Sequence, residues 1–335
     1  MKRSISIFLL LLALILALTS CFGRSESASN KTDKTKYVFL IAGMDDAAAN
    51  TDVLFTLSYD SDTLTTRIAQ IPRDTYYNFG GSQNKINQVY ASAMAKGMDK
   101  FTALQEFSHK LEEAFGAKFD GFIGVNLSVL RKLVDSLGGI DIELNSDMEI
   151  SVDGVDGAIS LKKGVNHIDG ECAEKFVRFR SGYAMGDLGR VDAQKIFLNA
   201  LFTRVASGVS LPMLLDIVKL VQSETVTDLS FTRLVDMIFD SMNKKGEKNT
   251  FYATLPGEPT TAPSGLSYYV LNKKSTAEML KTYMFSEKEF DQSRRFLNTE
   301  WDNFVNIYND DSIGLIEYSK DSLDDMHIAS AREVR

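Results

Sequence analysis

The chain has 335 residues, a formal net charge of -8, 44% hydrophobic residues and 24% charged residues, which is the composition of a globular protein rather than of a disordered or collagenous one. Two cysteines exclude a scaffold of several disulfides and a thiolate-rich zinc site, and three histidines leave little material for a histidine metal cage. The acidic total argues against broad nucleic-acid binding, which relies on clustered cations. Catalysis is therefore expected to use carboxylates and arginines, and an anionic ligand needs a local basic patch.

The N-terminus has the pattern of an export signal. Two basic residues precede an apolar run over residues 5–18, and the sequence LTSC follows and ends at Cys21. The run is shorter than the roughly 20 apolar residues that span a bilayer, and the pattern resembles a bacterial lipoprotein signal with a lipidated cysteine. We predict a signal peptide over 1–20, lipidation at Cys21 and a polar tether over 21–36; an uncleaved membrane anchor is the alternative. Both alternatives place the rest of the chain on the extracytoplasmic face of the cell membrane.

Beyond the tether, strand patterns and helix patterns alternate along the chain. The continuous apolar run over 37–42 is typical of a strand buried on both faces. The segments 53–59 and 64–71 are rich in strand formers and flank a turn cluster, which predicts a hairpin. Further strands are predicted over 119–125 and 140–144, and helices over 98–115, 128–137, 186–207 and 211–221. This alternation predicts an α/β fold in which helices cover a mixed sheet.

An acidic loop lies between the first two predicted strands. Asp45, Asp46 and Asp52 are close in sequence there, and their mutual repulsion is offset only if a cation or an arginine lies nearby. Mg²⁺ prefers oxygen ligands and usually takes one or two carboxylates together with substrate phosphates and water. The loop is therefore a possible magnesium site. The alternative, equally compatible with the spacing, is that these aspartates cap turns.

Basic residues follow the hairpin and recur later in the chain. Pro72 cannot extend a strand ladder, so it predicts that Arg73 lies at a sheet edge, where ligands of open α/β sheets bind. Arg190 and Gln194 are four residues apart on a predicted helix and share a face.

Two further arginines precede that helix. Arg178 and Arg180 share a side only if their segment is extended. Guanidinium forks suit phosphate oxygens, so the basic residues together can hold a pyrophosphate. The alternative for each arginine is a surface ion pair with a neighbouring acid.

Taken in chain order, these stretches resemble the motifs of the LytR-CpsA-Psr family. The resemblance is carried by GMD (43–45), NTD (50–52), IPRDT (71–75), KIN (85–87), LGGI (137–140), DGE (169–171), VRFR (177–180) and GDLGR (186–190). It implies a three-layer α-β-α sandwich with a central mixed β-sheet, as a catalytic domain over 37–285. We expect 286–335 to be a polar C-terminal extension of unknown role.

The resemblance also implies a function and a set of site residues. Members of the family are extracytoplasmic enzymes that transfer anionic glycopolymers, such as teichoic acid or capsule, from a polyprenyl pyrophosphate carrier to peptidoglycan. By resemblance, Asp45 and Asp52 hold Mg²⁺, and Arg73, Asp52 and Asp74 are catalytic. The pyrophosphate-binding residues by the same resemblance are Arg73, Lys85, Arg178, Arg180, Arg190 and Gln194. Two alternatives stay open: a non-catalytic lipoprotein that binds or senses polyprenyl pyrophosphates, and a transcriptional attenuator, which the export signal opposes.

Two departures and one further expectation accompany the resemblance. Family members often carry arginine where this chain has Asn50 and Ala193, so positive charge near the phosphates is reduced. The apolar faces of the helices over 101–115 and 196–221 are expected, by resemblance, to line a groove for the polyprenyl chain. The alternative is that these faces belong to the ordinary core.

Overall fold

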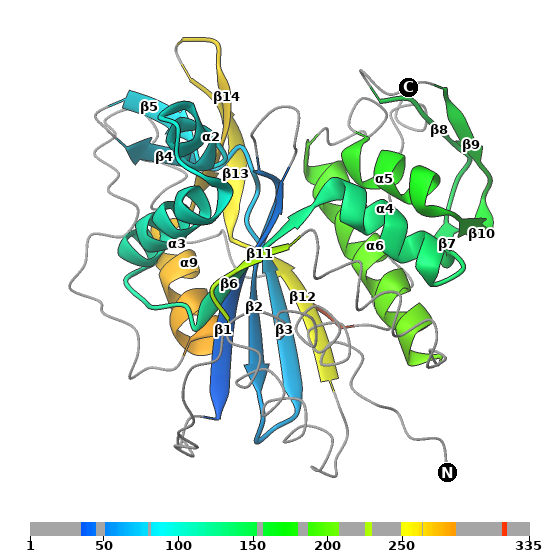
Figure 1. The fold of residues 1–335 in the computed structure, drawn as a ribbon, viewed down its shortest axis with the longest axis horizontal. Helices are drawn as coiled ribbons and strands as arrows, with labels where there is room; N and C mark the ends of the chain where they lie inside the picture. Colours follow the sequence, from blue (N-terminus) through cyan, green and yellow to red (C-terminus); the bar gives the residue numbers. More distant parts are fainter. Residues whose placement is uncertain are drawn as a thin grey trace.

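A mixed sheet forms the centre of the fold (Figure 1). In this computed structural model the described residues are 35–44, 51–79, 82–152, 157–179, 187–207, 225–229, 249–262, 264–285 and 317–319. The strands of this sheet are β1 (Lys36–Met44), β2 (Thr51–Asp60), β3 (Thr65–Gln70), β6 (Gly121–Asn126), β11 (Thr225–Thr227), β12 (Asn249–Thr254) and β15 (Glu317–Ser319). Their spatial order is β11-β6-β1-β2-β3-β12-β15. The β1–β6 and β3–β12 pairs are parallel and the other pairs are antiparallel, which confirms the mixed sheet.

Helices flank this sheet in two groups, seen on the left and the right of Figure 1. The first group contains α2 (Gln88–Ala95), α3 (Lys100–Phe115), α9 (Lys273–Met279) and the π-helical turn η1 (Leu280–Met284). The second group contains α4 (Leu127–Ser136), α5 (Gly170–Arg178) and α6 (Asp187–Ala206). Paired strands outside the sheet are β4 (Tyr76–Phe79) with β5 (Ser82–Lys85), β7 (Ile140–Leu144) with β10 (Gly164–Ile168), β8 (Met148–Ile150) with β9 (Ile159–Leu161), and β13 (Gly257–Thr261) with β14 (Ser267–Leu271).

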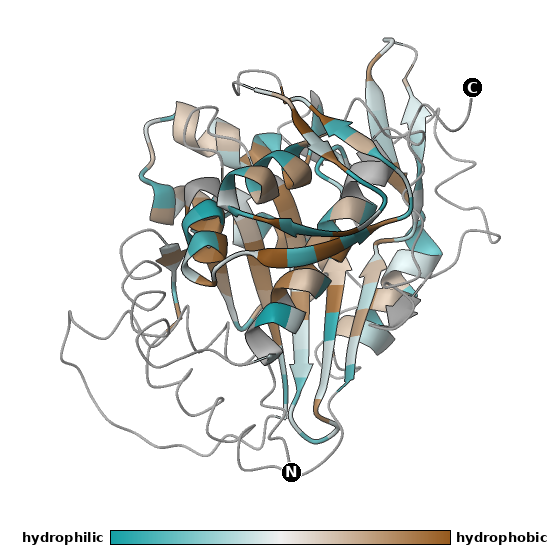
Figure 2. Ribbon diagram, turned by 90° about the vertical axis from the view of Figure 1, so that its right-hand side faces the viewer, coloured by the Kyte–Doolittle hydropathy of each residue, from teal (hydrophilic) through white to brown (hydrophobic). Residues whose placement is uncertain are grey.

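Strand β1 is buried on both faces, as its continuous apolar run predicts. Val38 and Leu40 pack into the core that the sheet shares with α2, α3 and α9, while Phe39 belongs to the cluster on the opposite face. A further apolar cluster joins α4, α5 and α6 to β7, with Phe176 and Phe197 at its centre. Figure 2 shows apolar residues along the central strands. Successive side chains of a strand point to opposite faces, so the sheet has an apolar core on each face. The α/β class is confirmed.

The element ends follow local chemistry. Asp99 caps α3, since its carboxylate accepts hydrogen bonds from the backbone N–H groups of Phe101 and Thr102, and Gly116 ends the helix at a φ of 67°. The predicted hairpin, the strands over 119–125 and 140–144 and the helices over 98–115, 128–137 and 186–207 are confirmed within a few residues. The helix predicted over 211–221 lies outside the described residues.

Part of the predicted C-terminal extension joins the sheet. Strand β15 pairs antiparallel with β12, with Tyr318 opposite Tyr252. Composition gave no indication of this strand, because a three-residue edge strand carries no periodic pattern. Within the ranges that the structure describes, no helix combines the length and apolar character needed to cross a membrane. The apolar run over 5–18 and Cys21 lie outside those ranges.

Candidate functional site

The carboxyl ends of four strands meet at one edge of the sheet. Strands β1, β3, β6 and β12 run in the same direction and end at the upper end of the sheet in Figure 1, where the antiparallel strand β2 begins. Ligands of open α/β sheets bind at such an edge. The loops that follow β1 and β3 carry the acidic and the arginine motifs, so the topology brings both to this edge.

The turn after β3 holds Arg73 in place. The backbone N–H of Thr75 donates to the carbonyl of Pro72 at 2.9 Å, and that of Asn87 donates to the carbonyl of Arg73 at 3.4 Å. The N–H of Ile86 donates to the carbonyl of Thr75 at 2.7 Å. These bonds fasten the IPRDT turn to the chain that leaves β5. Strand β3 ends at Gln70, so the prediction that Pro72 places Arg73 just beyond the strand is confirmed.

Three predicted site residues are brought together at this turn. Lys85 Nζ lies 2.9 Å from Asp74 Oδ1, and Arg73 Nε lies 3.9 Å from the same oxygen. The Lys85 ammonium also lies 5.8 Å from the ring centroid of Tyr268 on β14. The side chains of this cluster are only 14% to 27% exposed. Partial burial strengthens their attraction relative to water, so Asp74 holds two cations at the sheet edge.

Gln194 is buried behind this edge, at 2% exposure. Its Oε1 accepts a hydrogen bond from Gln70 Nε2 at 2.8 Å, and its Nε2 donates to the carbonyl of Val177 at 3.1 Å. Sequence reasoning singled out Gln194 but missed Gln70. One signal could have identified Gln70: it is a polar residue at the end of a strand whose other side chains are mostly buried. Direct binding of pyrophosphate by Gln194 stays a prediction.

Of the three later arginines, Arg178, Arg180 and Arg190, the structure describes only the side chain of Arg178. Arg178 is the last residue of α5, and its Nη1 lies 3.0 Å from Glu174 Oε1, so the ion-pair alternative describes this side chain. Its backbone is helical, and the extended conformation begins at Phe179. Arg180 lies outside the described residues; Arg190 lies on α6, but its side chain is outside the description. Their convergence on one pocket stays a prediction.

The acidic motif coincides with a β-bulge. Gly43 pairs with Val53 and Met44 pairs with Thr51, so Asp52 is the extra residue in β2. Bulges redirect side chains and recur beside active sites. A side chain at Gly43 would crowd the Cβ of Val53, at 2.9 Å, so glycine permits this close approach.

Some of the groups at this bulge are oxygen ligands of the kind that a hard cation such as Mg²⁺ binds. The Thr51 hydroxyl is buried and has no hydrogen-bond partner among the described residues. Asp45 and the Asp52 side chain lie outside the description. In the described part of the chain no group of three or more histidine, cysteine or acidic side chains could hold a metal. Carboxylates and a hydroxyl are ligands that Mg²⁺ accepts.

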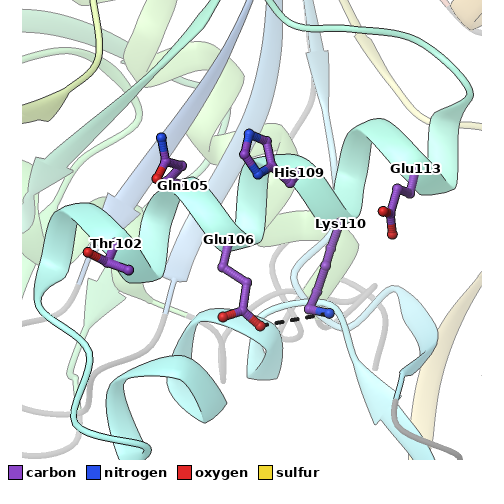
Figure 3. A pocket seen from close by; sticks show the side chains of 6 residues that line it. All are labelled: Thr102, Gln105, Glu106, His109, Lys110 and Glu113. Atoms are coloured by element: carbon purple, nitrogen blue, oxygen red, sulfur yellow. Dashed lines mark ion pairs between the residues drawn. The ribbon is translucent and has the colours of Figure 1, made fainter.

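A hollow of about 380 Å³ lies elsewhere, on the exposed face of α3 (Figure 3). It is lined by Thr102, Gln105, Glu106, His109, Lys110 and Glu113. None of the predicted site residues lines it.

The apolar face of α3 is turned into the core instead. Leu104, Phe107 and Leu111 are fully buried there, and Phe101 is 40% exposed. Ile196 and Phe197 of α6 are likewise buried in a core cluster. For these residues the structure favours the core alternative over a polyprenyl groove.

The fold is an α/β sandwich in which Arg73, Asp74 and Lys85 cluster at the carboxyl ends of the parallel strands. The model of the LytR_cpsA_psr family matches residues 20–284, and the chain belongs to this family. It is 29% identical, over 261 residues covering 76% of this chain and 79% of the relative, to the polyisoprenyl-teichoic acid–peptidoglycan teichoic acid transferase TagU of Bacillus subtilis strain 168.

Solved structures agree with this assignment. The crystal structure of B. subtilis TagV has a TM-score of 0.58 and 25% identity and covers 74% of this chain and 95% of TagV. The structure of TagT bound to LI-WTA has a TM-score of 0.56 and 21% identity and covers 78% of this chain and 95% of TagT. At that identity the TagT likeness concerns the fold.

Proposed function

We propose that this protein transfers an anionic glycopolymer, of the teichoic acid or capsule type, from a polyprenyl pyrophosphate carrier to peptidoglycan. Family membership and the likeness to TagU support a transferase of this kind. The observation that carries the proposal is the cluster of Arg73, Lys85 and Asp74 at the carboxyl edge of the sheet. Two cations fixed at a partly buried edge can bind a diphosphate even though the chain as a whole is acidic.

The reaction is a phosphoryl transfer. A sugar hydroxyl oxygen of peptidoglycan forms a bond to the phosphorus that bears the polymer, and the bond from that phosphorus to the bridging oxygen breaks. Polyprenyl phosphate leaves with the bridging oxygen, and the hydroxyl proton passes to a base. Arg73 and Lys85 orient the pyrophosphate and offset the charge that develops on its oxygens. Positioning and electrostatics supply most of the rate enhancement in such reactions.

Two carboxylates are proposed for the proton. Asp74 already contacts Lys85 at 2.9 Å and Arg73 at 3.9 Å, which suits a carboxylate that orients cations. Asp52, the extra residue of the β2 bulge, lies at the same edge. Asp52 and Asp74 are both proposed as candidates for the proton acceptor, which has to lie within hydrogen-bond reach of the attacking hydroxyl.

Asp45 and Asp52 are proposed to hold Mg²⁺. The bulge at Asp52 and the buried Thr51 hydroxyl, which has no hydrogen-bond partner among the described residues, support an oxygen-rich site at this edge. When bound, the ion supplies positive charge that stabilises the phosphate oxygens.

The protein is further proposed to act as a lipoprotein at the extracytoplasmic face of the cell membrane. The N-terminal pattern that ends at Cys21 supports cleavage after residue 20, lipidation of Cys21 and a tether over 21–36. A Cys21→Ser variant is expected to leave the membrane fraction and to lose lipid labelling. An unchanged membrane fraction would support the uncleaved anchor instead.

The transfer itself is tested with purified protein. Mg²⁺, a synthetic polyprenyl-pyrophosphate-linked disaccharide and a peptidoglycan oligosaccharide are supplied together, and the products are identified by mass spectrometry. We expect the acceptor to gain the sugar phosphate and polyprenyl phosphate to accumulate. Donor binding without transfer would contradict the proposal and support a non-catalytic lipoprotein.

A further inference from the structure

A buried amide bridge joins the sheet to the two helices that carry the later arginines. Gln70 ends β3 and is 3% exposed, and Gln194 lies on α6 and is 2% exposed. Gln70 Nε2 donates to Gln194 Oε1 at 2.8 Å, and Gln194 Nε2 donates to the carbonyl of Val177 on α5 at 3.1 Å. The bridge therefore connects β3, α6 and α5 in one continuous chain of hydrogen bonds.

Chemistry fixes the direction of this chain. The carbonyl of Val177 only accepts, so the NH₂ end of Gln194 must face it. The oxygen of Gln194 then faces Gln70, which must present its own NH₂ group. Gln70 Oε1 is left buried without a hydrogen-bond partner among the described residues. Neither amide can turn over without placing two like groups against each other, so the bridge has one arrangement.

The bridge lies next to each stretch that carries a predicted arginine. Gln70 is three residues before Arg73 and pairs with Phe55 of β2 and Thr254 of β12. Val177 immediately precedes Arg178, and Gln194 lies one helical turn after Arg190. A shift of α5 or α6 relative to β3 would therefore move the later arginines relative to Arg73.

We propose that Gln70 is a positioning residue for the transfer reaction. Acting through Gln194, it sets α6 and the end of α5 over the carboxyl edge of the sheet and so fixes the spacing between Arg73 and the later arginines. This inference rests on the proposed function. Buried hydrogen bonds are costly to break because the groups left behind have no water partner. Without the Gln70 amide, the Gln194 oxygen would lose its hydrogen bond, and we expect α6 and the end of α5 to shift in response.

The test compares Gln70→Met with a matched control. Methionine keeps the length of the side chain and removes the donor. Thr56→Val removes the bond from the buried Thr56 hydroxyl to the Ala69 carbonyl, at 3.5 Å, within the same sheet. Steady-state transfer is measured with the lipid-linked disaccharide and the peptidoglycan oligosaccharide. Hydrogen exchange is followed in peptides covering 170–179 and 187–201.

For Gln70→Met we expect kcat/KM for the donor to fall on the order of 10- to 100-fold, since small misplacements have effects of that size. The acceptor KM should stay unchanged, and exchange should accelerate at the end of α5 and in α6. Thr56→Val should show neither effect. If Gln70→Met does not fold, Gln70→Asn serves instead, because its amide is one methylene too short to reach Gln194.

The outcomes separate the two proposals. Transfer by the wild type together with unchanged donor kinetics or unchanged exchange in the Gln70 variants overturns the positioning role alone. Equal losses in Gln70→Met and Thr56→Val also overturn it, because they would reflect a general weakening of the sheet. Absence of transfer by the wild type overturns the proposed function and this inference with it.

Discussion

Lys85 Nζ lies 2.9 Å from Asp74 Oδ1 and so ties the end of β5 to the turn that follows β3. The two side chains are 27% and 21% exposed, which leaves this pair partly solvated. An ion pair of this kind contributes little to stability. The role of this ion pair is to hold the Lys85 ammonium group beside the turn that carries Arg73.

Replacement of Lys85 by methionine is expected to reduce transfer with little loss of stability. A charge-assisted hydrogen bond to phosphate contributes about 1.5 to 3 kcal/mol, which corresponds to a fall in kcat/KM on the order of 10- to 150-fold. The free energy of unfolding should change by less than about 1 kcal/mol. Lys110→Met is the matched control, because Lys110 pairs with Glu106 at similar exposure on α3. Equal kinetics in the two variants would remove Lys85 from the site.

Arg73→Ala is expected to abolish transfer and to leave the fold intact. The Arg73 side chain is 14% exposed, beside Asp74 at 3.9 Å, and the turn around it is held by backbone bonds that the substitution does not touch. Arg73→Lys should recover only part of the activity, because lysine keeps the charge and loses the planar fork. Transfer rates and thermal melting are measured together. Normal turnover by the alanine variant would exclude Arg73 from the reaction.

Removal of magnesium is expected to stop transfer reversibly. Chelation with EDTA should abolish product formation, and added Mg²⁺ should restore it, since the ion offsets charge on the phosphate oxygens. Asp52→Asn should lower Mg²⁺ affinity in a calorimetric titration, a readout that does not depend on turnover. Asp62→Asn, in the turn at the other end of β2, is the control. Equal Mg²⁺ affinity of the wild type and Asp52→Asn would exclude Asp52 as a ligand of the metal.

Gly139→Ala is expected to destabilise the protein more than Gly97→Ala does. Both glycines have positive φ values, 92° and 83°, so each alanine pays backbone strain of about 1 to 2 kcal/mol. At Gly139 the new Cβ would also collide with the His167 ring, while nothing lies within 4 Å at Gly97. Chemical denaturation should show the larger loss for Gly139→Ala. Equal losses would mean that the His167 ring moves aside without cost.

His167 is expected to make stability depend on pH. Its Nδ1 lies 2.7 Å from Asp141 Oδ1 and its Nε2 lies 3.0 Å from the carbonyl of Gly138. The hydrogen bond to Asp141 raises the pKa of His167, helped by that carbonyl and opposed by partial burial and by Arg204. Because the folded state binds the proton more tightly, the contribution is complete below the ordinary histidine pKa. It is lost as the pH rises through the raised value.

The measurement compares His167→Gln with the wild type at pH 5.5 and pH 8. The wild type should melt at a higher temperature than the variant at pH 5.5, and the difference should shrink at pH 8. The pair is mostly exposed, so the effect stays under about 1 kcal/mol. His109→Gln on the exposed face of α3 serves as the control. A difference that does not depend on pH would exclude protonation of His167 as its cause.

Local patterns in the sequence predicted four of the seven strands of the central sheet, β1, β2, β3 and β6, and the helices α3, α4 and α6. The apolar run over 37–42 predicted β1, and the helical spacing of apolar residues over 98–115 predicted α3. These features depend on neighbours within a few residues, which hydrophobic periodicity and capping chemistry describe well. Strands β11, β12 and β15 and helices α2, α5 and α9 are short, carry little periodic pattern and were not predicted.

The sequence alone determined the α/β class, the position of Arg73 just beyond β3 and the family resemblance. Each depends on a local feature: the alternation of strand and helix patterns, the proline at position 72, and the order of the motifs. Only the tertiary structure decided that Lys85 meets Asp74 and that Gln70 bonds to Gln194. The two glutamines are 124 residues apart. Contacts at that separation depend on how the helices pack against the sheet, and no local preference of the chain encodes that packing.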